Sequence, residues 1–161
     1  MKVEQLMNRN VCTCLPSDTL ATAAGRMWDL DIGSLPVVNE DGSVAGMITD
    51  RDICMAAYTQ GRPLADIPVA RAMSKVAYSC RPTADVAEAE EIMRTRQVRR
   101  LPVISALGEL VGIVSLNDLA HEAGKPSSKS ARAVSPQDVT STLAAVTVPR
   151  RTSTAPTSRA S

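Results

Sequence analysis

The feature that most constrains this 161-residue chain is an internal repeat at an offset of 66 positions. Gly46-Met47-Ile48-Thr49-Asp50-Arg51-Asp52 recurs as Gly112-Ile113-Val114-Ser115-Leu116-Asn117-Asp118. The same offset pairs Leu35-Pro36-Val37 with Leu101-Pro102-Val103, without any gap. Repetition this regular predicts two copies of one supersecondary unit.

Each copy of the motif ends in an apolar run, a hydroxyl residue and, three residues later, an aspartate. This pattern predicts a strand that runs into a helix, with Thr49 or Ser115 as the N-cap and Asp52 or Asp118 in the first turn. A hydroxyl, free backbone N–H groups and a carboxylate then share one concavity, which suits a ribose diol beside a phosphate. The alternative is that Ser/Thr-x-x-Asp serves purely as a capping pattern. Its occurrence twice in register favours binding.

Composition limits which functions the chain can support. Apolar residues make up 44% of the sequence, but aromatic residues make up 2% and phenylalanine is absent. The core must therefore be aliphatic, and nucleic acid is an unlikely partner because bases would find few rings to stack on. Residues 1–121 carry 12 Lys or Arg against 15 Asp or Glu, whereas residues 122–161 carry 6 against 2, so the tail is basic.

Localisation and cysteine chemistry follow from simple patterns. Met1-Lys2-Val3 leads into polar residues, and no run approaches the roughly 18 apolar residues of a membrane span, so we expect a cytoplasmic protein with no membrane partner and reduced thiols. Cys12 and Cys14 alternate along an expected strand, and a thiol or zinc sensor is an alternative function. Metal-binding pairs usually have the spacing Cys-x-x-Cys, and the chain has a single histidine, His121, so we expect no metal site.

Hydrophobic periodicity predicts the same order of elements in both repeats. A short helix over residues 2–8 precedes the first repeat, and Leu20, Met27, Val86 and Met93 are expected in the core. The expected strands cover residues 11–14, 35–39 and 44–48, then 77–80, 101–104 and 110–114; the expected helices cover residues 20–30, 50–58, 86–93 and 116–123, with caps at Asp18 and Thr83 and a left-handed helix stop at Gly33.

We expect three parts: repeat 1 over residues 1–60, a linker and repeat 2 over residues 61–123, and a largely disordered tail over residues 124–161. The tail is rich in Ser, Thr, Pro and Ala. Ser135-Pro136-Gln137-Asp138 could cap a short helix through Leu143-Ala144, with Val139, Leu143 and Val146 as an apolar stripe. Whether this helix docks on the repeats stays open at this point.

The two Gly-x-x-Thr/Ser-x-x-Asp motifs, the Leu-Pro-Val strands and the Met-x6-Cys-x-Pro segments before each repeat resemble the CBS-domain pair, or Bateman module. The resemblance covers residues 3–121. Among stand-alone forms, the chain looks similar to bacterial hypoxic-response-type two-repeat proteins, through Asp31-Ile32-Gly33-x-Leu35-Pro36, Thr49-Asp50-Arg51-Asp52 and Gln97-Val98-Arg99-Arg100-x-Pro102-Val103. The implied fold is α/β, with tandem β-α-β-β-α repeats packed about a pseudo-twofold axis and a flexible C-terminal tail.

The resemblance implies two clefts that take the adenosine part of AMP, ADP, ATP or a related adenosyl ligand. In the first cleft, Thr49 and Arg51 would meet phosphate, Asp52 would accept the ribose hydroxyls, and Met47 and Val98 would enclose adenine. Arg99 would reach across from the other repeat as a second phosphate cation. As alternatives, Asp50-Arg51-Asp52 is an ordinary solvated helix start and Arg99-Arg100 a surface pair.

The second cleft would use Ser115, Asn117 and Asp118, facing Ile32, Gly33 and Ser34. Asn117 replaces Arg51 here, and Gly33-Ser34 replaces Arg99-Arg100, so Arg100 is the cation left within reach. We expect weaker phosphate binding in this cleft, because charge-assisted bonds from arginine to phosphate are the strong ones.

The sequence has no nucleophile with a neighbouring base and no Walker-type glycine loop, so we expect no catalytic residues and no cofactor. The resemblance implies a regulatory module that binds AMP or ATP, forms a homodimer and passes the energy state to an unknown effector protein. The alternative is an interaction module without a ligand, whose tail binds a partner protein or RNA.

Overall fold

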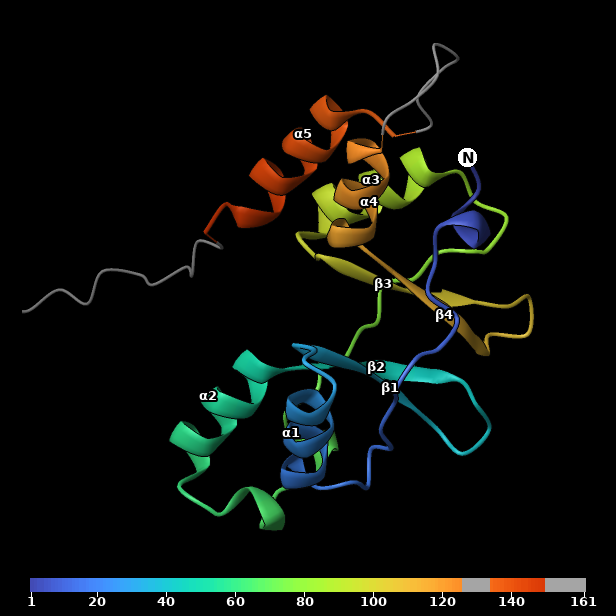
Figure 1. Ribbon diagram of the computed structural model, residues 1–161. Helices are drawn as coiled ribbons and strands as arrows, with labels where there is room; N and C mark the ends of the chain where they lie inside the picture. Colours follow the sequence, from blue (N-terminus) through green and yellow to red (C-terminus); the bar gives the residue numbers. More distant parts are fainter. Residues whose placement is uncertain (126–133, 150–161) are drawn as a thin grey trace, which may run out of the picture.

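The computed structural model describes residues 1–125 and 134–149, and its two halves have the same sequence of elements (Figure 1). Repeat 1 contains α1 (Leu20–Asp29), β1 (Ser34–Val38), β2 (Val44–Thr49) and α2 (Asp50–Gln60). Repeat 2 contains α3 (Val86–Arg96), β3 (Arg100–Ile104), β4 (Leu110–Ser115) and α4 (Leu116–Gly124). The short 3-10 helices are η1 (Val3–Gln5), η2 (Leu64–Asp66) and η3 (Val69–Arg71), and α5 (Pro136–Thr147) follows.

Each repeat forms an antiparallel hairpin with the same register. Ser34 pairs with Thr49 in the first hairpin and Arg100 with Ser115 in the second. Both hairpins carry an irregularity next to the turn, between Val37 and Val38 and between Val103 and Ile104. Figure 1 shows the two sheets facing each other, with α1 and α2 outside one and α3 and α4 outside the other. The α/β fold class that the resemblance implied is confirmed.

The turns of the two hairpins lie at one end of the stacked sheets, and the strand-to-helix junctions lie at the opposite end (Figure 1). Ser43 bridges Glu109 between the turns, and the Leu110 N–H donates to the Gly42 carbonyl at 3.2 Å. Gly42 adopts a φ of 81°, a left-handed conformation that glycine reaches without strain. The turns therefore join the repeats at one end.

The predicted strands over residues 11–14 and 77–80 are single bridges, from Cys14 to Val37 and from Cys80 to Val103. Cys14 N–H donates to the Pro36 carbonyl at 3.1 Å, and the ladder does not continue. The next hydrogen bond of a parallel ladder would need an N–H at Pro36, which proline lacks. Pro102 ends the bridge of Cys80 in the same way. The predicted helix over residues 2–8 is likewise shorter, since it is the 3-10 helix η1.

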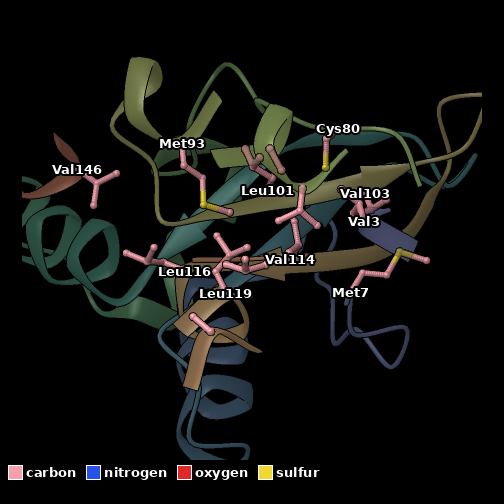
Figure 2. Close-up of a cluster of buried hydrophobic side chains, with 14 residues drawn as sticks. Val3, Met7, Cys80, Met93, Leu101, Val103, Val114, Leu116, Leu119 and Val146 are labelled. Carbon is pink, nitrogen blue, oxygen red and sulfur yellow. The ribbon is translucent and has the colours of Figure 1, made fainter. Parts of the chain in front are cut away.

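Each repeat is completed by the segment that precedes the other one. Val3 and Met7 belong to the core of repeat 2, whereas Ile67 and Val69 belong to the core of repeat 1. Figure 2 shows Val3 and Met7 among the buried side chains of repeat 2, beside Val103 and Val114. The chain therefore crosses between the repeats twice, which ties them into one unit.

Gly46 and Gly112 make this crossing possible. A Cβ atom at Gly46 would lie 2.3 Å from the Ser74 carbonyl oxygen, and one at Gly112 would lie 2.7 Å from Met7 Sδ. These are the first residues of the repeated motif. Their role is the close approach of another backbone segment, which an isolated glycine within a strand often indicates.

The core positions expected from periodicity are confirmed, but some predicted helix ends are wrong. Leu20, Met27, Val86 and Met93 are all buried. The N-cap of α1 is Thr19, not Asp18, and that of α3 is Asp85, not Thr83. Asp31 takes the left-handed conformation at the end of α1 with a φ of 52°, as Gln97 does after α3, so Gly33 does not supply the stop.

The expectation of a disordered tail does not hold for residues 134–149. Ser135 caps α5 as predicted, and the helix packs on α3 and α4 with Val134 and Val146 buried in the core of repeat 2. Thr142 is fully buried and accepts a hydrogen bond from Arg94 at 3.0 Å, whereas Leu143 is exposed. The predicted stripe is thus right for Val139 and Val146, which pack on the core of repeat 2, and wrong for Leu143. Residues 126–133 and 150–161 lie outside the described residues.

Within residues 1–125 and 134–149, no helix has both the length and the apolar composition that crossing a membrane requires.

Candidate functional site

The junction of β2 and α2 holds the predicted carboxylate in a fixed position. Thr49 donates from its N–H and its hydroxyl to Asp52 Oδ2, at 3.0 and 2.7 Å, and the Asp52 N–H donates back to the Thr49 hydroxyl at 3.1 Å. This reciprocal arrangement is a capping box, and it satisfies two otherwise free donors at the helix start. The capping interpretation is therefore correct for this motif, and the question becomes what else the carboxylate can do.

Repeat 2 reproduces the arrangement at the junction of β4 and α4. Ser115 donates to Asp118 Oδ2 from its N–H at 2.7 Å and from its hydroxyl at 2.6 Å, and accepts from the Asp118 N–H at 3.3 Å. In both repeats the other carboxylate oxygen, Oδ1, forms no hydrogen bond with a described residue. Each aspartate therefore keeps one oriented acceptor free.

The capping box changes the roles that the other atoms can take. The Thr49 hydroxyl already donates to Asp52, so it cannot donate to a phosphate at the same time. The Asp50 N–H donates to the Gly33 carbonyl at 3.2 Å, and the Asp52 N–H is used by Thr49. A phosphate at this helix start must therefore be bound mainly by arginine side chains.

Three such side chains, Arg51, Arg99 and Arg100, come from the two junctions. Arg51 and Arg99 are exposed and Arg100 is half-buried, and none forms an ion pair or a side-chain hydrogen bond with another described residue. Asn117, which replaces Arg51 in repeat 2, is exposed. The guanidinium groups are thus available to an anionic ligand.

The strand entries lie beside the helix starts of their own repeats. Gly33 contacts Asp50, whose Oδ2 would lie 3.1 Å from an added Cβ, and the Leu116 N–H donates to the Arg99 carbonyl at 2.9 Å. The structure therefore brings Ile32, Gly33 and Ser34 to the Thr49–Asp52 junction, and Val98, Arg99 and Arg100 to the Ser115–Asp118 junction. That each strand entry faces the junction of the other repeat stays a prediction.

Ser34 has an additional property that the sequence did not reveal. Its side chain is 6% exposed, and its Oγ has no hydrogen-bond partner among the described residues. A buried hydroxyl without a partner costs free energy, and a bound molecule is one way to satisfy it. The remaining predicted residues, Met47 and Val98, are half-buried apolar side chains.

One cavity in the described part of the chain borders the entry of β1, and a second lies at the opposite end of the sheets. A cavity of about 450 Å³ lies against α1 and α2 and reaches Ile32 and Gly33, whereas one of about 260 Å³ lies near the hairpin turns, between Arg9 and Leu110. Neither is lined by Thr49, Asp52 or their counterparts in repeat 2. The larger cavity was not foreseen from the sequence, since it depends on how two helices are spaced.

The buried cysteines are poorly suited to redox chemistry. Burial raises the pKa of Cys14 to about 11, with a further increase from Asp18, and burial with Glu88 nearby raises the pKa of Cys80 to about 11. Both thiols therefore stay protonated at neutral pH, and the thiolate is the reactive form. Among the described residues, Cys12 and Cys54 are also free thiols.

Comparison with known proteins gives a consistent result. The family model of the CBS domain matches residues 3–58 and 65–125. "CBS domain-containing protein YhcV" of Bacillus subtilis is 40% identical over 118 residues, which cover 73% of this chain and 82% of that protein. "Hypoxic response protein 1" of Mycobacterium tuberculosis is 36% identical over 116 residues, covering 72% and 80%.

Solved structures agree with this match. A crystal structure of Hypoxic Response Protein I with two coordinated zinc ions superposes with a TM-score of 0.70 at 33% identity, covering 78% of this chain and all of that one. A crystal structure of CBSX2 in complex with AMP has a TM-score of 0.66 at 21% identity, covering 74% and 93%, and so shares the fold.

Proposed function

The chain belongs to the CBS-domain family, as its two repeated motifs predicted, and from this premise we propose that it is a regulatory module that binds an adenine nucleotide between its repeats. The observation that carries the proposal is the duplicated junction. Each copy orients a carboxylate with one free oxygen, and three arginines without a described partner stand beside the pair. Stand-alone proteins of this family are generally regulatory and not catalytic.

In the proposed first site, Asp52 Oδ1 accepts the hydroxyls of the ribose. Arg51 and Arg99 bind the phosphates, a task for which the planar guanidinium is well matched. Met47 and Val98 supply apolar contacts to adenine, since the chain has few aromatic rings that could stack on it. Thr49 serves this site by holding Asp52 in place.

In the proposed second site, Asp118 Oδ1 has the role of Asp52, and Ser115 holds it. Asn117 brings no charge, and Arg100, which pairs with Ser115 across the hairpin, is the cation of this site. The hydroxyl of Ser34, which lacks a described partner, is a further group for a ligand there. This site should therefore bind phosphates more weakly than the first, and it suits a less charged adenosyl ligand.

Several observations support AMP or ATP as the ligand class. CBSX2, which shares the fold, has been crystallised in complex with AMP. The cations available at the junctions match the charge of a nucleotide. We further propose that the protein acts in the cytoplasm, where reduced thiols are the rule, as a homodimer that signals through an effector protein. Such signalling requires a ligand that binds two conformations with different affinity.

The test is thermal unfolding of the full chain with adenosine, AMP, ADP and ATP. A ligand at ~100 times its dissociation constant adds about 2.7 kcal/mol to the free energy of unfolding, which a melting curve resolves readily. Arg99→Ala should reduce the stabilisation by ATP and leave that by adenosine unchanged, because adenosine has no phosphate. If none of these compounds stabilises the protein, the alternative of an interaction module without a ligand replaces this proposal.

A further inference from the structure

Helix α5 lies along α3 with its last turn beside the end of α3. Arg94 donates to the Thr142 hydroxyl at 3.0 Å, and Gln97 Nε2 donates to the Ala145 and Val148 carbonyls at 3.3 and 3.2 Å. Arg94 and Thr142 are 48 positions apart, as are Gln97 and Ala145, so the two helices run in the same direction. The carbonyls at a helix end have no partner within the helix, and here Gln97 satisfies two of them.

Gln97 lies between α3 and the strand entry that the proposed sites use. It is the C-cap of α3 and takes a left-handed conformation, with a φ of 52° and a ψ of 46°. Residues other than glycine seldom adopt this conformation, and their surroundings must hold them in it. Val98, Arg99 and Arg100 follow directly in the chain. A contact that fixes Gln97 therefore also fixes the start of this strand entry.

The other helix beneath α5 begins at the second junction. Helix α5 packs on α4 as well as on α3 (Figure 1), and the first turn of α4 carries Asp118, with Ser115 as its cap. The Leu116 N–H donates to the Arg99 carbonyl at 2.9 Å, which joins the start of α4 to the strand entry after α3. All the groups that repeat 2 supplies to the proposed sites thus come from the ends of the two helices that α5 covers.

Repeat 1 forms the same backbone without a fifth helix among the described residues. The counterpart of Gln97 is Asp31, which has the same φ of 52° at the end of α1, but a carboxylate cannot donate to helix carbonyls. The larger cavity, a groove between α1 and α2 beside Trp28, lies on the face of repeat 1 that corresponds to the face under α5. The repeat fold therefore does not require α5, whose contact with Gln97 is an addition to it.

The docking of α5 is supported by apolar burial and opposed by a carboxylate. Val134 and Val146 are buried in the core of repeat 2, whereas Glu90 is 4% exposed and its Oε1 has no hydrogen-bond partner among the described residues. Asp138 of α5 brings a like charge towards Glu90, which Arg94 offsets in part. A buried carboxylate without a partner costs free energy. Helix α5 should therefore open locally more readily than the rest of repeat 2.

We propose that α5 regulates the nucleotide sites. Docked on α3 and α4, it holds the strand entry and the start of α4 in the arrangement that binds nucleotide. Groups that are already in place lose less freedom on binding, so docking raises the affinity. The coupling is reciprocal, and nucleotide must strengthen the docking of α5 by the same factor. Docked and released α5 are then the two conformations that signalling requires. This inference rests on the nucleotide binding proposed above.

The first experiment is amide hydrogen exchange of the full chain with and without saturating AMP or ATP. We expect exchange over residues 136–147 to slow by at least about 5-fold, the lower end of the usual range of coupling factors. Gln97→Ala removes the contact at the end of α3, so α5 should exchange faster and respond less to nucleotide. Asp31→Ala is the matched control, since Asp31 has the same backbone conformation in repeat 1, and it should leave exchange in α5 unchanged.

The second experiment measures nucleotide affinity by calorimetry when α5 is released. Val146→Asp places a charge in the buried face of α5 and should raise the dissociation constant for AMP or ATP by at least about 5-fold. Leu143→Asp adds the same charge to the exposed side of the same helix and should leave the dissociation constant unchanged. Should Val146→Asp fail to fold, the exchange of the wild type and of Gln97→Ala decides the question.

The outcomes separate the coupling from the binding function. If nucleotide binds the wild type but leaves exchange in α5 unchanged, or if Val146→Asp retains the wild-type affinity, the coupling is overturned and the proposed function stands. Tighter binding by Val146→Asp would make α5 an inhibitor and would also overturn the proposal. Equal weakening by Leu143→Asp would assign the effect to charge and not to docking, with the same consequence. A wild type that binds no nucleotide overturns both proposals.

Discussion

The two repeats share one backbone plan but differ in what their outer helices face. In repeat 2, α5 covers α3 and α4, and the positions that it covers include the polar residues Glu90, Arg94 and Gln97. In repeat 1 the same surface is open and its edge carries Trp28. Among the described residues, equivalent surfaces of a duplicated fold can therefore be covered by a further helix in one copy and left uncovered in the other.

The junctions differ in a second way. Both hold an aspartate by a capping box, yet repeat 1 has Arg51 where repeat 2 has Asn117. At the strand entries the relation is reversed, since Arg99 and Arg100 replace Gly33 and Ser34. The arginines are thus distributed over both repeats, and duplication alone does not make the two junctions equal.

The largest loss of stability is expected at Gly46 and Gly112, where the segment that precedes one repeat packs on the other repeat. Gly46→Ala should lower the free energy of unfolding by about 3 kcal/mol, because the new Cβ meets the Ser74 backbone at 2.3 Å. Gly112→Ala should cost about 1 kcal/mol, because its nearest neighbour is the flexible Met7 side chain. Chemical denaturation measures both. Equal losses would mean that the two crossings are equally tight, against the geometry.

Nucleotide affinity should separate the two junctions. Asp52→Ala should remove hydrogen bonds to a charged acceptor worth about 1.5–3 kcal/mol, or roughly 10- to 150-fold in the affinity of the tighter phase for AMP or ATP. Asp118→Ala should change a weaker phase alone. Isothermal titration calorimetry measures the two phases.

A control is needed because both aspartates also cap helices. Asp138→Ala is a suitable control, since Asp138 also lies three residues after a helix cap and accepts from the Ser135 hydroxyl at 2.7 Å, but belongs to α5. It should leave nucleotide affinity unchanged. If Asp118→Ala removes the tight phase while Asp52→Ala is silent, the ranking of the sites is reversed; if both are silent and nucleotide still binds, the site assignment is wrong.

Undocking α5 would uncover the outer helices of repeat 2, as those of repeat 1 already are among the described residues. Val146→Asp places a charge in the core of repeat 2 and should lower the free energy of unfolding by about 2 kcal/mol, with release of the helix limiting the cost. Leu143→Asp, on the exposed side of the same helix, should change it by less than about 0.5 kcal/mol. Urea unfolding compares them, and similar values for the two variants would argue against docking.

The smallest effect concerns Glu90, whose counterpart in repeat 1 is the uncharged Ala24. Burial, and then the carboxylate of Asp138, raise the pKa of Glu90 above its usual 4.5, and Arg94 offsets part of this. The folded state then holds the proton more tightly than the unfolded chain, so stability should fall as pH rises from 4.5 through the raised pKa.

Glu90→Gln should remove this decrease and leave the variant more stable than the wild type at neutral pH. Glu88→Gln, an exposed change on the same helix, should keep the decrease. Unfolding free energies at a series of pH values test both statements. A wild-type curve that is flat across the interval would show that α5 does not bury this carboxylate.

The sequence alone was sufficient for the repeat, the order of helices and strands, the aliphatic core and the positions of the two capping motifs. These features depend on periodicity and on side chains within four residues of each other, so the local sequence contains the information. Thr49 with Asp52 and Ser135 with Asp138 are examples, since each pair is three residues apart. The α5 helix was predictable for the same reason.

Tertiary structure decided what those elements contact. The expected strand over residues 11–14 is a single bridge, because Pro36 lacks the N–H that a longer ladder would need. This absence has an effect only where the folded chain places Cys14 beside Val37. The exchange of Val3 and Ile67 between repeats, the docking of α5 and the groove beside Trp28 all join residues far apart in the chain. Periodicity shows that a side chain is buried but not against which partner, because many apolar surfaces are interchangeable until the chain is folded.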